Sequence, residues 1–353
     1  MNQLDLWFGR ERLIANEERV RAFWHGAERL LISVESQKFR YRQTFDADEI
    51  LRLAPLNLQH QASLPGINLP SFYPDYGTIS TAKYWGGTTR FDSTGGNIFC
   101  DPVAPNVEAA LAISPLPPDH PTMDGYQGVS IYHRLCEHLE SDALWLRSPD
   151  MQGPLNTAAL VVDQPELLMS MVSEPEAVHS LLDGITDWEI SYGQYLRDES
   201  NGRLCGNIWP YTVLPIDLGL SLTEDMMPLL STKAYRTFAP PYLERLDRAF
   251  GGLLIHCCGD WGRHAQTLAD ADIRLRGAEF HYPFTTIEEL APLADSTVFI
   301  PYISLDKQSR YASADEYYRD LLENTPEHYR YWFPFAEESD EALAFCRRHG
   351  FGA

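Results

Sequence analysis

The stretch Gly251-Gly-Leu-Leu-Ile-His-Cys-Cys-Gly-Asp260 decides which fold to expect. Its apolar run, Leu253-Leu-Ile255, has the character of a short buried strand. A histidine and a cysteine, His256 and Cys258, follow directly, and then a glycine and a polar turn. Reactive side chains at the end of a strand are typical of α/β proteins, because the strand holds them rigidly and the loop leaves them open to substrate.

Strands and helices alternate along the chain around this stretch. Strand-like apolar segments are expected at residues 30–35, 143–146, 204–209, 252–256, 275–281, 297–302 and 329–333, and helices at 263–271, 286–294, 313–323 and 338–348. Pro165 and Pro175 are typical of helix starts, and Ser231 is a predicted N-cap. This alternation indicates βα units and a parallel sheet. The length of 353 residues favours a single closed (β/α)8 TIM barrel, and the absence of a Gly-x-Gly-x-x-Gly or P-loop motif argues against a nucleotide-binding sheet.

Three segments need a separate interpretation. Residues 1–30 are expected to form an N-terminal helical extension that packs on the barrel and stops at Gly26. A second helical pattern at 46–60 is expected to break at Pro55. Residues 64–106 are rich in Gly, Pro, Tyr and Thr and are too long for a simple connection. We interpret them as a loop region over one end of a single domain that comprises the whole chain.

Composition and charge limit the class of protein. The sequence contains 28 Lys and Arg residues and 50 Asp and Glu residues, which gives a formal net charge of −22. This charge argues against nucleic-acid binding. The six cysteines are not spaced as a disulfide framework. We see neither a signal peptide nor an apolar run of the roughly 20 residues that span a membrane. We therefore expect a cytoplasmic protein with reduced thiols, without a membrane partner, as a monomer or homodimer.

Three blocks of the sequence carry a family resemblance. They are Gly153-Pro together with Pro175-Glu-Ala-Val-His-Ser-Leu-Leu-Asp183, the run over residues 222–242, and His256-Cys-Cys-Gly259. They resemble the Gly-Pro element with its Pro-Glu helix, the Leu-Ser-Pro-x-x-Phe run, and the His-x-Cys-Gly strand end of the uroporphyrinogen decarboxylase (URO-D) superfamily of TIM barrels. In the second block Thr232 replaces the usual proline.

The resemblance is closer to one branch of that superfamily than to its namesake. True uroporphyrinogen decarboxylases carry an Arg-Gln-Ala-Gly-Arg-Tyr motif, whereas residues 34–43 read Val-Glu-Ser-Gln-Lys-Phe-Arg-Tyr-Arg-Gln. In the cobalamin-dependent methyltransferase branch, and in the related cobalamin-independent methionine synthases, zinc binds a His-x-Cys pair, a glutamate on the next strand and a distant cysteine. The resemblance thus implies zinc at His256, Cys258 and Glu279. The distant cysteine has no counterpart in residues 332–339, and Cys346 lies in a predicted helix.

Further candidate site residues lie near the expected strand ends. His281 is two residues from Glu279, so both should face the same side of their strand, whereas Cys257 should face away from His256 and pack. Asp225 is interpreted as a solvated or helix-capping residue. The candidates for catalysis are His256, His281 and Asp260, and those for substrate binding are Glu35, Asn207, Trp209 and Tyr302.

The first functional hypothesis is a zinc-dependent methyltransferase that moves a methyl group between a corrinoid protein and a small acceptor or donor. The sequence has no Asp-x-His-x-x-Gly motif, so the corrinoid would be carried by a partner protein. Two alternatives remain. One is a metal-independent decarboxylase or lyase that uses His256, His281 and an acidic residue for proton transfer. The other is a non-catalytic barrel that binds a small molecule. The sequence leaves the substrate open.

Overall fold

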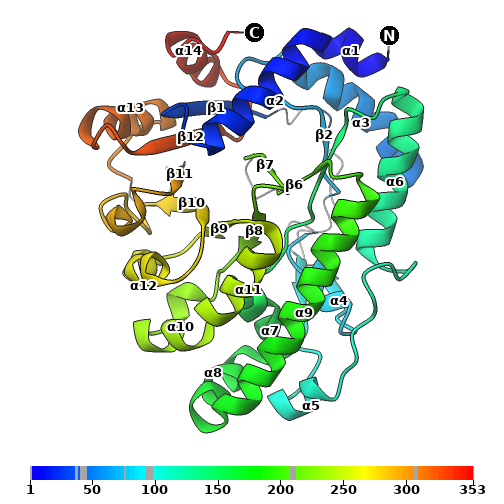
Figure 1. The fold of residues 1–353 in the computed structure, drawn as a ribbon, viewed down its shortest axis with the longest axis vertical. Coiled ribbons are helices and arrows are strands. Elements are labelled where there is room, and N and C mark those ends of the chain that lie inside the picture. The colour runs from blue at the N-terminus through cyan, green and yellow to red at the C-terminus, as the bar shows by residue number, and fades with distance from the viewer. Residues whose placement is uncertain are drawn as a thin grey trace.

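The main sheet has six parallel strands that follow each other along an arc (Figure 1). The computed structural model describes residues 2–35, 39, 46–74, 77–91, 98–206, 212–305 and 309–352. In sheet order the strands are β1 (Leu30–Val34), β12 (Arg330–Phe335), β11 (Val298–Ile303), β10 (Leu275–Tyr282), β9 (Leu253–Cys257) and β8 (Leu220–Thr223). Each neighbouring pair is parallel, so the carboxyl ends of all these strands lie at the same end of the sheet.

A second sheet extends the strand layer. It contains, in order, β2 (Ser71–Phe72), β5 (Trp145–Arg147), β6 (Leu204–Gly206) and β7 (Leu214–Pro215), of which β7 runs antiparallel to β6. Backbone hydrogen bonds join the two sheets at both sides: Ile67 N donates to Ile32 O at 2.8 Å, and Thr223 N donates to Met151 O at 2.9 Å. This is a mixed α/β fold with a central parallel sheet, consistent with an α/β barrel. The closed eight-unit form stays a prediction.

Helices lie on the outer side of the strand arc (Figure 1). The α-helices are α1 (Gln3–Phe8), α2 (Arg10–Trp24), α3 (Ala47–Gln61), α4 (Ser80–Lys83), α5 (Val107–Leu111), α6 (Asp124–Leu139), α7 (Pro154–Val161), α8 (Gln164–Ser173), α9 (Pro175–Glu199), α10 (Thr232–Phe238), α11 (Pro240–Phe250), α12 (Ala265–Asp270), α13 (Ala314–Asn324) and α14 (Asp340–Arg348). The 3-10 helices are η1 (Met227–Leu229), η2 (Gly262–His264) and η3 (Ala291–Leu293), and β3 (Thr89–Phe91) pairs with β4 (Ile98–Cys100) apart from the main sheets.

The N-terminal helices pack against the strand layer. The Trp24 indole donates to Val213 O at 2.9 Å, and the Phe23 ring lies 5.8 Å from that of Trp332 in β12. Gly26 follows α2 with a φ of +91°, in the left-handed region that suits a helix stop, as predicted. The interpretation of residues 1–30 as an extension of a single domain stays a prediction.

Two predicted helices differ from the structure. Helix α3 continues through Pro55, so the predicted break is wrong. Asp46 caps its amino end, and one buried face that includes Ile50 and Leu58 holds the helix against the core, which outweighs the hydrogen bond lost at the proline. The prediction of a helix at 286–294 is also wrong, because only the 3-10 helix η3 forms there. This short segment contains a proline at its start.

Five strands, β2, β3, β4, β7 and β8, and the helix α4 lie where the sequence suggests loops, and two of these strands bear on the site. Residues 71–72 form β2 within the predicted loop region, and residues 220–223 form β8. Both are too short to show an alternating pattern of their own. The second strand matters for the site, because β8, and not the segment at 204–209, is the neighbour of β9.

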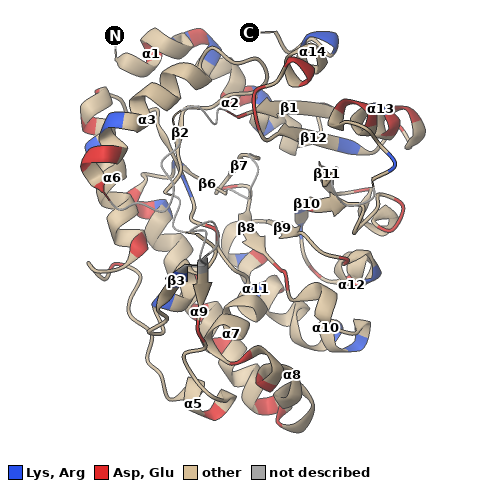
Figure 2. Ribbon diagram, turned by 180° about the vertical axis from the view of Figure 1, so that it is seen from behind, with Lys and Arg blue, Asp and Glu red and all other residues tan. Residues whose placement is uncertain are grey.

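The distribution of charged residues agrees with the excess of Asp and Glu in the sequence. Acidic side chains are spread over outer helices such as α8 and α13, with fewer basic ones between them (Figure 2). Among the described residues, no helix combines the length and the apolar character that crossing a bilayer requires.

Candidate metal centre

The carboxyl ends of β8, β9 and β10 bring five ionisable side chains together. His256 at the end of β9 is in register with Glu279 of β10 on one side and with Thr223 of β8 on the other. Asp225 follows β8 by two residues, and Cys258 follows β9 directly. Because the strands are parallel and adjacent, residues far apart in sequence meet at one end of the sheet.

The first set of residues, here called the histidine–glutamate set, is His256, Glu279 and His281. Glu279 is 1% exposed, and its Oε2 contacts Nδ1 of His256. Its other oxygen, Oε1, lies 3.1 Å from Nε2 of His281. Each residue offers one ligand atom, and the three atoms lie within 4.8 Å of one another. The predicted pairing of His256 with a glutamate on the next strand is therefore present in the geometry.

The second set, the aspartate–cysteine set, is Asp225, His256 and Cys258. Its three ligand atoms also lie within 4.8 Å of one another. The Asp225 carboxylate accepts a hydrogen bond from Cys258 N at 3.1 Å and lies 3.4 Å from Cys258 Sγ. Asp225 thus fixes the backbone and the thiol of the residue that follows β9. His256 is the member that both sets share.

The protonation states of the two histidines at this end of the sheet suit metal binding. Burial lowers the pKa of His256 and that of His281 to about 4, against the opposing charge of Asp225. Both imidazoles are therefore neutral near pH 7, which is the form that binds a metal. At Cys258, desolvation of the thiol, followed by the charge of Asp225, raises the pKa to about 12. A metal bound there would displace the thiol proton.

The donor atoms fit a zinc-like ion in one further respect. His256 Nδ1 and Glu279 Oε2 are buried atoms and contact each other. Imidazole nitrogen, thiolate sulfur and carboxylate oxygen are the ligand types that zinc uses. The predicted trio of His256, Cys258 and Glu279 draws on both sets, and its role as a ligand set stays a prediction.

The other predicted site residues lie at varying distances from this centre. The Tyr302 ring of β11 lies 4.7 Å from that of His281, so it borders the centre. Asp260 is exposed, lies 3.9 Å from Arg263 and belongs to neither set. Asn207 and Trp209 lie outside the described residues.

Two cysteines and a second buried histidine stand apart from both sets. Cys257 and Cys346 are fully buried and belong to neither set. His264 is also buried, its Nε2 donates to Met227 O at 2.9 Å, and its ring packs on that of Tyr235. Cys257 and Cys346 contribute to the buried core, and His264 packs against Tyr235.

Glu35 forms an ion pair with a residue that was not among the predicted site residues. Arg147, at the carboxyl end of β5, is 4% exposed and lies 3.3 Å from Glu35, while its Nε donates to Ser71 Oγ at 2.7 Å. A charged residue directly after the apolar run at 143–146 is the signal that could have indicated it. Asp225 was missed for another reason: its position depends on β8, which the sequence does not reveal.

Two cavities lie at opposite ends of the strands. One of about 270 Å³ is bordered by Asp225, Met226, Gln152, Asn156 and Gln164, beside the metal-ligand candidates. The non-catalytic alternative is favoured by a cluster without a cavity, so this space weighs against it.

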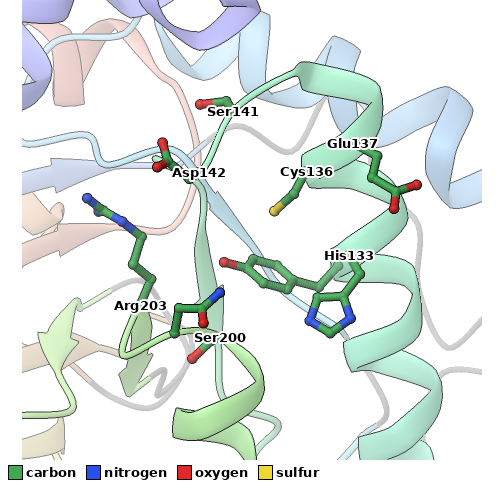
Figure 3. Close-up of a pocket in the computed structure, with 9 residues that line it drawn as sticks. His133, Cys136, Glu137, Ser141, Asp142, Ser200 and Arg203 are labelled. Atoms are coloured by element: carbon green, nitrogen blue, oxygen red, sulfur yellow. The ribbon is translucent and has the colours of Figure 1, made fainter.

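The other cavity, of about 610 Å³, lies where chain segments enter β5 and β6 (Figure 3). Asp142 and Arg203 lie on one side of it, and Cys136 and His133 of α6 lie on the other. It is at the amino ends of its strands, away from the end where barrel enzymes hold their catalytic groups.

Comparison with known proteins identifies a shared fold. No protein-family model and no curated protein matches the chain. Among solved structures, a methyltransferase from Methanosarcina mazei matches with a TM-score of 0.66 and 13% identity, over 96% of this chain and 99% of that one. A protein from Listeria monocytogenes described as a vitamin-B12-independent methionine synthase matches with a TM-score of 0.36 and 11% identity, over 64% of this chain and 67% of that one. At 13% identity the first match shows a methyltransferase-like fold and nothing finer.

Proposed function

We propose that this chain is a zinc-dependent methyltransferase of the URO-D superfamily, with the metal held by His256, Cys258 and Glu279. The observation that carries the proposal is the convergence of His256 with the buried Glu279, whose side chains contact each other, beside the thiol of Cys258. The fold shared with a protein named as a methyltransferase supports it.

Two of the three proposed ligands, Cys258 and Glu279, have a neighbour that fixes their position. Asp225 holds the backbone and the thiol of Cys258, and His281 contacts the oxygen of Glu279 that faces away from His256. Such outer partners orient the ligands and tune their basicity. Three protein ligands leave the fourth position of a tetrahedral ion for substrate.

When bound, the zinc would lower the pKa of a substrate thiol so that it reacts as a thiolate. The protein's own groups would complete the step. Asp225 and His281 lie within reach of the ligand atoms and could accept the proton that the thiol loses when it becomes a thiolate, before the sulfur takes the methyl group. The cavity beside Asp225 offers room for the rest of a small substrate.

The methyl donor is proposed to be a corrinoid carried by a partner protein. This part rests on the family resemblance and on the absence of a cobalamin-binding motif in the chain. The open carboxyl end of the strands is the side from which such a partner would reach the metal centre.

Metal content and methyl transfer test the proposal together. We expect about one zinc per wild-type chain by plasma mass spectrometry, almost none in His256→Ala, and full content in the buried control Cys257→Ala. With free methylcobalamin and a panel of small thiols, wild type should demethylate the corrinoid and His256→Ala should not.

Activity that survives chelation of all metal would contradict the proposal. A decarboxylase or lyase activity that is insensitive to chelators would favour the alternative in which His256, His281 and an acidic residue transfer a proton.

A further inference from the structure

A second group of acidic and hydroxyl side chains lies buried behind the metal centre, between the strands and the helices. Glu189 of α9 and Glu224, the residue after β8, are both 0% exposed, and the charge of Glu224 acts on Glu189. Thr157 of α7 and Thr81 of α4 lie beside them and are also fully buried. No described Lys or Arg pairs with either glutamate.

Oxygen atoms crowd around one hydroxyl of this group. Thr157 Oγ1 lies 3.0 Å from Glu189 Oε1, 3.3 Å from the carbonyl of Gln152 and 3.4 Å from Thr81 Oγ1. A hydroxyl has a single proton to donate, so it cannot satisfy all of these neighbours. The backbone of Thr157 also donates to Gly153 O at 2.9 Å, and Gly153 is the residue against which Glu224 packs.

Three carboxylate oxygens of the group have no hydrogen-bond partner among the described residues. They are Glu224 Oε1, Glu224 Oε2 and Glu189 Oε2. A buried carboxylate without a partner is very unfavourable, because it loses its hydration and gains nothing in return.

Protonation alone does not satisfy these oxygens. A protonated carboxyl carries an O–H group and a carbonyl oxygen that need partners of their own, and neither oxygen of Glu224 has one among the described residues. A cation bound between the two glutamates would give these oxygens a partner and balance their charge. The donors are two carboxylates, two hydroxyls and a carbonyl, and such all-oxygen sets suit hard alkali and alkaline-earth ions, not zinc.

We propose that Glu189, Glu224 and Thr157 form a second, buried binding site for a hard cation of the alkali or alkaline-earth class. This site is distinct from the proposed zinc centre and does not depend on the proposed function. Glu224 N donates to His256 O at 2.8 Å, so a cation there would also steady the strand end that carries the metal-ligand candidates.

Thermal unfolding of the full chain tests the site with Na⁺, K⁺, Mg²⁺ and Ca²⁺ chlorides in turn, at constant ionic strength kept by tetramethylammonium chloride. The His256→Ala variant serves as the background, so that binding at the zinc centre does not contribute. We expect one of the four ions to raise the Tm in a saturable way by at least about 3 °C.

Variants of the proposed ligands localise the effect. Glu189→Gln, Glu224→Gln and the conservative Thr157→Val should each abolish or strongly weaken the rise, and exposed Glu176→Gln on the same helix should retain it. If a glutamate variant fails to fold, Thr157→Val still decides the matter. An equal Tm in all four salts and in tetramethylammonium chloride, or a rise that persists unchanged in the ligand variants, would overturn the proposal.

Discussion

His256 is the residue at which the two candidate ligand sets meet. On one side its Nδ1 faces Glu279, and on the other it lies within 4.8 Å of the ligand atoms of Asp225 and Cys258. The chemistry of the centre therefore depends on which carboxylate joins the histidine and the cysteine. The hydrogen bonds of Asp225 to Cys258 suit a supporting role, and the direct contact of Glu279 with His256 suits a ligand.

Substituting the two carboxylates separately distinguishes these roles. Glu279→Gln should lower zinc affinity by more than about 100-fold, because a ligand is lost, whereas Asp225→Asn should lower it by only about 10-fold, as for an outer partner. Competition with a chromophoric chelator measures both affinities. A larger loss in Asp225→Asn would assign the metal to the aspartate–cysteine set instead.

His264 makes stability depend on pH. Burial lowers the pKa of this histidine below its usual 6.5, against its hydrogen bond to Met227 O. Its folded pKa is lower than its unfolded pKa, so its contribution is complete above about pH 6.5 and is lost as the pH falls below that value.

We expect the difference in free energy of unfolding between wild type and His264→Gln to become smaller from pH 7.5 to pH 5.5. Urea unfolding measures this difference. A difference that stays constant or widens over this range would show that His264 does not titrate as inferred.

At the scale of elements, Gly153 at the start of α7 shows how tightly the strand and helix layers meet. A Cβ at Gly153 would overlap Glu224 Oε1, so the carboxyl of Glu224 occupies the place of a capping side chain. This gives a physical reason for a glycine in the Gly153-Pro block. By contrast, Gly184 in the middle of α9 has open space around the corresponding position.

Two alanine substitutions form a matched pair on this point. Gly184→Ala should stabilise the protein by about 0.5–1 kcal/mol, because alanine favours a helix interior. Gly153→Ala should destabilise it by about 1–3 kcal/mol, because the new methyl group overpacks a buried site. Chemical denaturation gives both values. Equal effects of the two changes would mean that Glu224 does not fill the space beside Gly153.

Element length explains which parts of the fold the sequence could predict. The segments at 30–35, 252–256, 275–281, 297–302 and 329–333 are each at least five residues long and contain several apolar residues, and each lies at a strand of the main sheet. The four-residue strand β8 has no such signal and forms through pairing with β9. The glutamate on the strand after β9 was therefore predictable, whereas Asp225 depends on contacts that only the folded sheet creates.

On the scale of the whole molecule, the parallel strands place the described candidates at one end. Glu35, Arg147, Asp225, Cys258, His281 and Tyr302 all lie at or just past carboxyl ends of strands. The cavity lined by Asp142 and Arg203 lies instead at the amino ends of β5 and β6 (Figure 3). The architecture thus separates the candidate chemistry from the rest of the surface.

The zinc K-edge X-ray absorption spectrum of the purified protein tests the central claim most directly. We predict one sulfur neighbour at about 2.3 Å, with nitrogen and oxygen neighbours at about 2.0–2.2 Å, as for a site made by one cysteine, one histidine and one carboxylate. Cys258→Ser should remove the sulfur shell and leave the lighter neighbours. A protein without zinc, or a zinc spectrum that lacks the sulfur shell in wild type, would contradict the account.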